Sequence, residues 1–353
     1  MAALHDWLNG HAEELDQSAL LADAVLPELA GADLLRIGVP QSNGGAGGDV
    51  RDAIVAIATV AQQSVTAAFV FWGQRTFIEY LLQGSNAALL ERSLPSLLAG
   101  SRAGATGLSN AMKFLSGIEQ LQIAATPEGT GWRLNGGLAW VTNLRKSGFL
   151  AAAAVAPTDG APAAIIAFDG HAPGVSRSDD LDLVALRGSN TASVQLAQVE
   201  VGAADVIAND ATTWLPIVRP AFLGMQCGLS IGLTRASLEQ AASISAGSRN
   251  QLSPRILALQ QVLEARVATL LAGVHDGRFR SQAAELFRLR IELAELVQQA
   301  LMLELQAMGG RAYLQKEQGG FARRWRESAF IPVVTPSLVQ LQAALQQHES
   351  RAA

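Results

Sequence analysis

The spacing of apolar residues changes twice along the chain, and this constrains the fold more than any single motif. Residues 1–102 repeat apolar side chains at helical intervals, residues 103–208 form short and often alternating apolar runs, and residues 209–353 return to long helical intervals. Separate blocks of helices and strands are typical of segregated architecture rather than of a doubly wound sheet. We therefore expect an α+β fold with three domains at these bounds: an N-terminal helical domain, a middle antiparallel β-barrel or sandwich, and a C-terminal four-helix bundle.

The first domain is expected to contain a glycine-rich loop between helices. Ser18–Ala32 gathers leucines on one broad helical face, and Pro27 inside it predicts a kink or a new helix start. Asn43–Gly48 is rich in residues that tolerate positive φ, so it is predicted to be a loop, and Asp49 is a credible N-cap for the helix that follows. Further helices are predicted over 53–63, 67–82 and 86–98.

The middle domain is predicted from short apolar stretches that Gly, Pro, Asn or Asp separate. The sequence Pro-Thr-Asp-Gly at 157–160 is typical of a hairpin turn. No Gly-x-Gly-x-x-Gly follows a predicted strand, which disfavours a Rossmann site. Strands are predicted over 119–124, 131–135, 138–142, 149–154, 163–168 and 193–201.

The last domain is predicted from long helical periods joined by short connections. Ser253 followed by Pro254 places a cap and a proline at the start of one helix. Long helices with short connections are expected to run antiparallel to their neighbours, as in a bundle. Helices are predicted over 221–246, 254–272, 282–308 and 337–348.

Composition narrows the class of protein. Hydrophobic residues make up 49% of the 353 residues and charged residues 16%, which supplies a buried core and argues against disorder. A net charge of -5 with no basic run argues against nucleic-acid binding. The single cysteine, Cys227, lies in an apolar stretch and is expected to be a buried thiol in a reducing compartment. The apolar runs at 149–156 and 221–233 are too short to span a bilayer and no signal peptide is visible, so we expect a cytoplasmic protein with no membrane contact. We also expect no metal site.

The most informative motif is the helix end Gln306–Tyr313, Gln-Ala-Met-Gly-Gly-Arg-Ala-Tyr, followed by the basic segment Arg323–Glu327. A glycine pair at a helix end lets the backbone approach a large anionic cofactor closely. Two other motifs precede it: Trp-Val-Thr-Asn at 140–143 and Arg-Asn-Gln-Leu at 249–252. Together with the loop at 34–48, and in this order and spacing, they resemble the acyl-CoA dehydrogenase family of flavoproteins over nearly the whole chain.

This resemblance implies an FAD site. Trp140 would offer a flat surface beside the flavin ring and Thr142 a hydrogen bond to its polar edge, although each residue alone also suits a buried strand. Arg249 would pair with the pyrophosphate, although a solvated cation at a helix end is the simpler alternative. The other positions that match the family's cofactor-binding motifs are Leu108, Ser109, Leu252, Gln260, Gln306, Gly309, Gly310 and Ser337.

In the family, the elements that correspond to Arg249 and Gln306–Gly310 reach FAD bound in a neighbouring subunit. The resemblance therefore also implies a homodimer or a homotetramer. Leu108 and Ser109 replace the family's Thr-Glu pair, so their contacts with flavin are expected to be made by the backbone only. Leu252 replaces the customary phenylalanine of its motif.

The catalytic carboxylate of the family is missing from its expected place. The resemblance puts Thr335 where the family has its glutamate, and Ser337 where it has the threonine that follows. Some members carry the base early in the first bundle helix, but 214–233 contains no Asp or Glu. Glu327 is expected to form a salt bridge, and His348 could approach the flavin only if the final helix folded back. The catalytic residue is therefore unknown.

Three functions follow from these observations. The first is an FAD-dependent oxidoreductase that oxidises an acyl-CoA or related thioester by hydride transfer to flavin N5, with an electron-transfer flavoprotein as possible partner. The second is a flavin-dependent monooxygenase that uses reduced flavin and O₂, needs no α-proton base, and could be supplied by a flavin reductase. The third is a flavin-binding homologue without catalysis. The substrate is a small molecule that the sequence does not identify.

Overall fold

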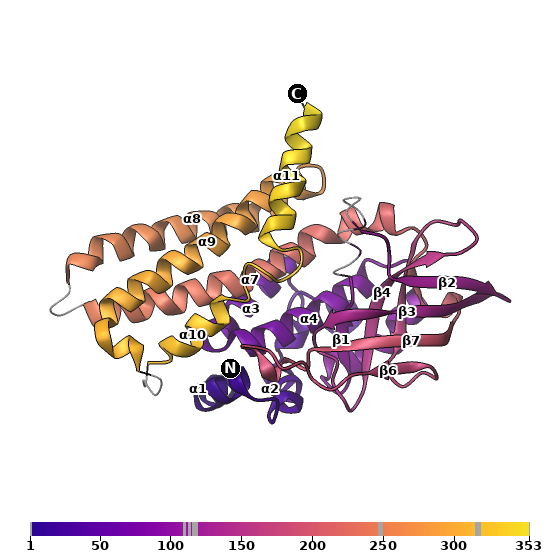
Figure 1. Ribbon diagram of the computed structural model, residues 1–353, viewed down its shortest axis with the longest axis horizontal. Helices are drawn as coiled ribbons and strands as arrows, with labels where there is room; N and C mark the ends of the chain where they lie inside the picture. Colours follow the sequence, from indigo (N-terminus) through magenta and orange to yellow (C-terminus); the bar gives the residue numbers. More distant parts are fainter. Residues whose placement is uncertain are drawn as a thin grey trace.

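The computed structural model describes residues 2–108, 111, 114, 119–245, 250–314 and 319–352. Figure 1 shows the sheet at one end of the molecule and three long helices at the other, with the helices α3 and α4 between them. The predicted order of helices, then strands, then helices along the chain is confirmed.

The N-terminal helices include one region where the prediction was partly wrong. Helix α1 ends at Gln17, and the Leu20 N–H then bonds the hydroxyl of Ser18 at 3.1 Å, so the chain turns and Leu20 is exposed instead of buried. Pro27 lies in the first turn of a new helix, where a missing N–H costs little. The helices are α1 (Ala2–Gln17), α2 (Val25–Gly31), α3 (Val50–Gln63), α4 (Val65–Leu82) and α5 (Ala87–Leu98).

The predicted loop and cap before α3 are confirmed. Gly44, Gly47 and Gly48 have φ values of 79°, 85° and 77°, which residues with a side chain rarely adopt. The Asp49 carboxylate accepts from the Arg51 N–H at 2.8 Å, and the carboxylate of Asp52 accepts from the Asp49 N–H at 2.8 Å. This reciprocal capping box fixes the start of α3.

The sheet is mixed, which corrects the prediction of an antiparallel domain. Strand β4 runs parallel to both β1 and β2, whereas the other pairs are antiparallel, and the order is β6-β7-β3-β2-β4-β5-β8 with β1 on β4. Strand β4 reads Phe-Leu-Ala-Ala-Ala-Ala-Val and is buried on both faces, as central strands are. The strands are β1 (Ala103–Thr106), β2 (Ile123–Glu128), β3 (Gly131–Val141), β4 (Phe149–Pro157), β5 (Ala164–Asp169), β6 (Val175–Arg177), β7 (Ala192–Val201) and β8 (Val206–Ala208).

Most predicted strands correspond to observed ones. The stretches 131–135 and 138–142 belong to a single strand, β3, whose register against β7 shifts after Leu134 and again after Leu138. The turn predicted at 157–160 joins the antiparallel strands β4 and β5. Strands β1, β6 and β8 were not predicted, because three or four residues carry too little alternation to be recognised.

The C-terminal helices form a group that differs from a closed four-helix bundle. Helix α7 packs against α3, α4, α8 and α9, so its neighbours come from both ends of the chain. Helix α11 contacts α9 and then projects away from the molecule (Figure 1). The helices are α7 (Ala211–Ser245), α8 (Ser253–His275), α9 (Ala283–Met308), α10 (Phe321–Ser328) and α11 (Leu338–Ala352).

One helical segment of the described chain, Asn250–His275, is long and apolar enough to cross a membrane by length and composition alone. Its apolar residues Ile256, Leu263 and Leu270 are buried, and the helix packs against α7 and α9. The most apolar stretch of this segment is 33% buried, and a single helix of this kind is weak evidence for a membrane span.

Candidate active site

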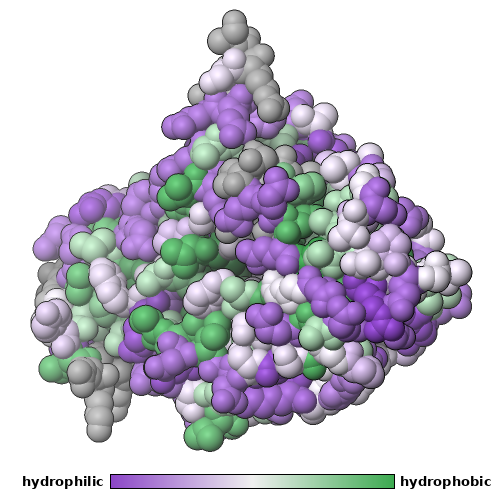
Figure 2. All heavy atoms as spheres, turned by 45° about the vertical axis from the view of Figure 1, so that its right-hand side comes forward, coloured by the Kyte–Doolittle hydropathy of each residue, from purple (hydrophilic) through white to green (hydrophobic). Residues whose placement is uncertain are grey.

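A cavity of about 740 Å³ lies where β3, α4, α7 and the segment from α10 to α11 meet. On the face shown in Figure 2, green hydrophobic side chains gather around a hollow in the middle, with purple polar residues on either side. The cavity is lined by Phe69, Trp72, Thr106, Trp140, Thr142, Leu183, Val184, Ala185, Leu186, Thr191, Phe222, Arg326, Ala329, Phe330, Val333, Val334, Thr335, Ser337 and Gln340.

One wall of the cavity is aromatic. Helix α4 presents Phe69 and Trp72, whose rings are 5.4 Å apart and nearly parallel. Phe330 meets Phe69 edge-on at 4.5 Å, and Phe222 of α7 meets Trp72 at 5.2 Å. The Trp72 Nε1–H donates to the carbonyl of Phe222 at 3.2 Å, so its polar hydrogen is already used inside the protein. This wall therefore favours an apolar group.

A second wall carries hydroxyl groups. The hydroxyl of Thr142 donates to the carbonyl of Ser189 at 3.2 Å and accepts from the hydroxyl of Thr191 at 3.0 Å. Trp140, near the end of β3 and two residues before Thr142, also lines the cavity and is 65% exposed. The structure thus brings together the two residues of the Trp-Val-Thr-Asn motif that were predicted to contact a flavin.

A third wall is the segment between α10 and α11. Thr335 and Ser337 both line the cavity, as the predicted positions of the missing glutamate and of a cofactor contact require. The carbonyl of Thr335 accepts from the Gln226 Nε2–H at 3.0 Å, which ties this segment to α7. The Ser337 N–H donates to the side chain of Gln340 at 2.7 Å.

The cavity wall offers no general base. Among its lining residues within the described chain, Arg326 is the one titratable group, and no carboxylate, imidazole, amine, thiol or phenol lies there. The sequence of 109–118, most of which is outside the described residues, contains no Asp, Glu or His. The carboxylate that the sequence predicts to be missing at Thr335 is therefore not supplied by another described lining residue.

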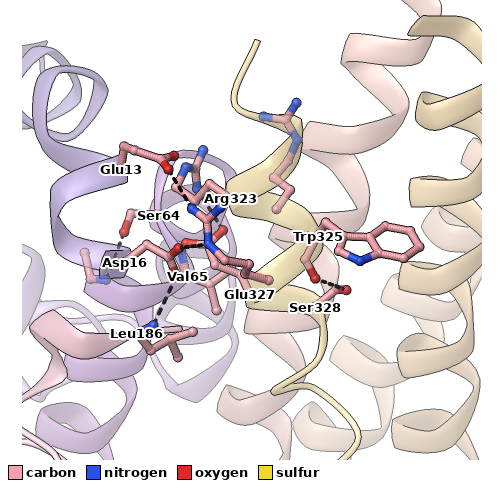
Figure 3. Close-up of polar contacts among 12 residues, drawn as sticks. Glu13, Asp16, Ser64, Val65, Leu186, Arg323, Trp325, Glu327 and Ser328 are labelled. Carbon is pink, nitrogen blue, oxygen red and sulfur yellow. Dashed lines mark hydrogen bonds and ion pairs between the residues drawn. The ribbon is translucent and has the colours of Figure 1, made fainter. Parts of the chain in front are cut away.

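The positive charge of Arg326 is matched by carboxylates from the first helix. Its Nε donates to Asp16 at 2.7 Å and its Nη2 to Glu13 at 2.6 Å. The second oxygen of Asp16 accepts from the Leu186 N–H at 3.1 Å. Figure 3 shows Glu13, Asp16 and Leu186 close to one another. Because Arg326 is compensated, the lining presents little net charge to a ligand.

Glu327, the next residue, faces away from the cavity and into a buried ion pair. One oxygen accepts from the Val65 N–H at 3.0 Å, and the other pairs with Arg323 at 2.8 Å (Figure 3). Burial raises the pKa of this carboxyl group to about 7. The expected salt bridge of Glu327 is confirmed, and Glu327 is not among the residues that line the cavity.

The remaining predicted cofactor contacts lie away from this cavity. The Arg255 Nη1–H donates to Gln306 at 3.3 Å, which joins the start of α8 to the end of α9. Figure 1 shows this end of the two helices on the side of the molecule opposite to the sheet. Leu252, Gln260, Gln306, Gly309 and Gly310 all belong to α8, α9 or the 3₁₀ turns beside them, and none lines the cavity.

Three other predicted positions are Leu108, Ser109 and Arg249. The side chain of Leu108 is buried in the core and does not line the cavity, so a contact from it would have to come from the backbone. Ser109 and Arg249 lie outside the described residues. Their assigned roles stay predictions.

Several functional candidates were missed at the level of sequence. Phe69, Trp72, Phe222 and Phe330 come from three separate segments, and no spacing rule links them. Gln226 could have been noticed, because it is a polar residue inside the apolar run at 221–233, and it is fully buried.

Comparison with known proteins agrees with this geometry. Residues 3–101 match the acyl-CoA dehydrogenase N-terminal domain. The chain is 26% identical over 214 residues to mitochondrial isovaleryl-CoA dehydrogenase of Pongo abelii, covering 59% of this chain and 50% of that protein. It is also 26% identical over 260 residues to a probable acyl-CoA dehydrogenase, fadE25, of Mycobacterium leprae, covering 71% of this chain and 65% of that protein. The matches thus span about half to two thirds of these curated relatives.

Solved structures resemble the chain over its whole length. A glutaryl-coenzyme A dehydrogenase complex with glutaryl-CoA has a TM-score of 0.80 at 15% identity, covering 100% of this chain and 95% of that one. KijD3 in complex with FMN and a dTDP-linked amino sugar has a TM-score of 0.79 at 18% identity, covering 98% and 92%. A nitrososynthase from Micromonospora carbonacea var. africana has a TM-score of 0.80 at 19% identity, covering 99% and 94%. These solved structures show that the chain has the acyl-CoA dehydrogenase fold, and its residues 3–101 and its curated relatives are similar to proteins of that family.

Proposed function

We propose that the protein is a flavin-dependent oxidoreductase that acts on a small, uncharged substrate. Its reaction would use no carboxylate base from the cavity wall. The observation that carries this proposal is the composition of the cavity wall. It combines flat aromatic and hydroxyl-bearing surfaces with no described residue able to accept a proton at neutral pH. A monooxygenase reaction, in which reduced flavin reacts with O₂, suits such a cavity better than abstraction of an α-proton from a thioester.

The cavity residues fit a flavin ring. A volume of about 740 Å³ falls within the range of small-molecule and cofactor sites, which is roughly 300–1,000 Å³. Trp140 would lie against a ring face, and the backbone of Thr142 would serve the polar edge, because the hydroxyl hydrogen of Thr142 is bonded to the carbonyl of Ser189. The bound flavin would supply the redox chemistry. The aromatic wall of Phe69, Trp72 and Phe222 would exclude water and hold the apolar part of the substrate.

We propose FAD rather than FMN because a second set of matching residues lies at the far end of α8 and α9. Within one chain these residues do not reach the cavity. They would therefore contact the dinucleotide part of FAD bound to a second copy of the chain, as the resemblance implies. A groove of about 490 Å³ on α8 and α9 and the exposed side chains of Leu257, Val262 and Met302 support a homodimer or a homotetramer through this face.

An acyl-CoA dehydrogenase reaction is the second candidate. The curated relatives, which carry that name, favour it. It would require a base that the described lining does not contain, and an electron-transfer flavoprotein would be a natural electron acceptor. The monooxygenase would instead need a flavin reductase or another source of reduced flavin.

The test begins with purified protein supplied with FAD. We expect flavin to bind, to stay oxidised when short- and medium-chain acyl-CoAs are added without oxygen, and to consume O₂ after reduction by an external reductant. Bleaching by an acyl-CoA alone would favour the dehydrogenase and contradict the monooxygenase. Failure to bind either FAD or FMN would favour a homologue without redox function.

The variant Thr335→Glu sharpens this test. It places a carboxylate at the wall position where the family has its base, without altering the aromatic wall. We expect it to gain slow reduction of the flavin by an acyl-CoA if the cavity admits a thioester. No reduction in this variant would mean that either the assignment of Thr335 to the position of the family's base or the acyl-CoA substrate class is wrong.

A further inference from the structure

Arg290 of α9 is a buried cation without a carboxylate partner among the residues that the structure describes. Its side chain is 0% exposed. The Nε–H donates to the amide oxygen of Gln226 at 3.0 Å, and the Nη2–H donates to the carbonyl of Ile331 at 2.7 Å. Both acceptors are neutral. Nη1 is buried and has no hydrogen-bond partner in the described part of the chain.

The neighbouring thiol does not neutralise this charge. Cys227 is the titratable group that acts on the pKa of Arg290. Burial raises the pKa of the Cys227 thiol to about 11, so it is uncharged at neutral pH. Burial also lowers the pKa of Arg290, but a guanidinium stays protonated in proteins because its ordinary pKa is so high. A positive charge is therefore held in the core.

This charge lies directly behind the third wall of the cavity. Gln226 accepts from Arg290 with its oxygen and donates to the carbonyl of Thr335 with its nitrogen. Arg290 itself holds the carbonyl of Ile331, four residues before Thr335. Gln226 and Arg290 thus fix both ends of the 331–335 segment, and Thr335 is exposed to the cavity on the other side.

An unpaired buried charge is unfavourable for folding unless something else compensates it. Its field is weakly screened in the protein interior, so it acts on groups several ångströms away. The cavity on the other side of Thr335 is where this field would act on a bound ligand.

We propose that Arg290 is a positioning residue whose charge stabilises negative charge on the reduced flavin bound in the cavity. This inference rests on the proposed function. Addition of two electrons and one proton to a neutral oxidised flavin gives an anion. A fixed positive charge behind the Thr335 wall favours that anion over the oxidised form, and so raises the midpoint potential of the bound flavin.

The test is the midpoint potential of bound flavin, measured without oxygen by reduction with dithionite in the presence of reference dyes. The proteins are the wild type, Arg290→Met and Arg290→Lys. At a fixed potential, we expect the ratio of reduced to oxidised flavin in Arg290→Met to fall at least tenfold, which is about 30 mV for two electrons. Arg290→Lys keeps the charge, so its ratio should stay within about threefold of the wild type.

Binding gives an independent readout. In Arg290→Met, the dissociation constant of reduced flavin should increase relative to that of oxidised flavin. By linkage, the factor should equal the change in the ratio of reduced to oxidised flavin that the midpoint potential gives. Gln226→Leu removes the hydrogen bond to the carbonyl of Thr335 but keeps the charge of Arg290. It therefore distinguishes an effect of the charge from an effect of the position of the 331–335 segment. We expect this variant to change the potential less than Arg290→Met does. A larger change in Gln226→Leu would overturn the electrostatic role.

The outcomes are distinguishable. Wild-type protein that binds no flavin would overturn the proposed function and this inference with it. Flavin bound by Arg290→Met with a wild-type potential would overturn this inference alone. Thermal melting of each apo-protein checks that it folds. Arg290→Gln, which keeps a neutral donor, replaces Arg290→Met where the latter does not fold.

Discussion

Two buried regions of the molecule treat arginine in opposite ways. On α10, Arg323 pairs with Glu327 and Arg324 pairs with Glu304, and both carboxylates are fully buried. Beneath the cavity, Arg290 is equally buried but is held by an amide oxygen and a backbone carbonyl. The first arrangement joins α10 to α4 and α9. The second leaves a net charge next to the candidate site.

The difference separates structural charges from charges available for function. A buried pair is largely self-contained, because each ion cancels the field of the other at a distance. Removing one partner strands the other, which is costly. An unpaired cation has no such partner to strand, and its field reaches its surroundings. The substitution of arginine by methionine should therefore have different consequences in the two regions.

The largest expected effect is that of Arg324→Met. The Nε–H of Arg324 donates to Glu304 at 3.1 Å, and a second nitrogen bonds the other carboxylate oxygen. The variant leaves the carboxylate of Glu304 buried without a cation, so we expect the free energy of unfolding to fall by about 3–5 kcal/mol. Urea denaturation followed by circular dichroism measures this. Arg290→Met strands only neutral acceptors and should lose less than half as much.

A double variant controls for the loss of packing. Arg324→Met combined with Glu304→Leu removes both charges and should recover most of the stability lost by the single variant. If the double variant were as unstable as Arg324→Met alone, the stranded carboxylate would not be the cause, and the contrast with Arg290 would lose its basis.

The next effect is a dependence of stability on pH that comes from Glu327. Burial raises its pKa from the ordinary 4.5 to about 7. Between these pH values the folded protein holds a proton that the unfolded chain has released. The contribution of Glu327 is therefore fully present below pH 4.5 and is lost as pH rises to about 7, by about 3 kcal/mol. Thermal or urea unfolding between pH 4 and pH 8 measures it.

Glu327→Gln isolates this contribution because the amide does not titrate. Between pH 4.5 and 8, the difference in stability between variant and wild type should shift by about 3 kcal/mol in favour of the variant. Asp16, whose pKa burial also raises, is present in both proteins, and because its charge helps to raise the pKa of Glu327 the measured shift includes this coupling. Parallel stability curves for the two proteins would mean that Glu327 does not titrate in this range.

The features that the sequence predicted are those with local causes. The capping box of Asp49 and Asp52, the turn at 157–160 and the cluster of positive-φ glycines each lie within a few consecutive residues. The pair Trp140 and Thr142 was found for the same reason, since both belong to one short motif at the end of β3. The order of helices and strands follows from periodicity, which is also local.

What the sequence did not predict depends on tertiary contacts. The link from Arg290 through Gln226 to Thr335 joins three segments that are far apart along the chain. The parallel pairing of β4 with β1 and β2 depends on which strands meet, and periodicity does not report it. The hydrophobic face expected at Leu20 was misjudged because one serine hydroxyl, that of Ser18, ended the helical pattern.

The smallest expected effect completes the comparison with a surface ion pair. Arg235 of α7 donates two hydrogen bonds to Glu264 of α8, at 2.9 and 2.8 Å, but the side chain of Glu264 is 56% exposed. Water screens this pair and solvates the carboxylate when the cation is removed. Arg235→Met should therefore lower the free energy of unfolding by no more than about 1 kcal/mol, and less in high salt. A loss as large as that of Arg324→Met would show that burial does not set the cost of removing an arginine here, and the distinction between the α10 pairs and Arg290 would then rest on geometry alone.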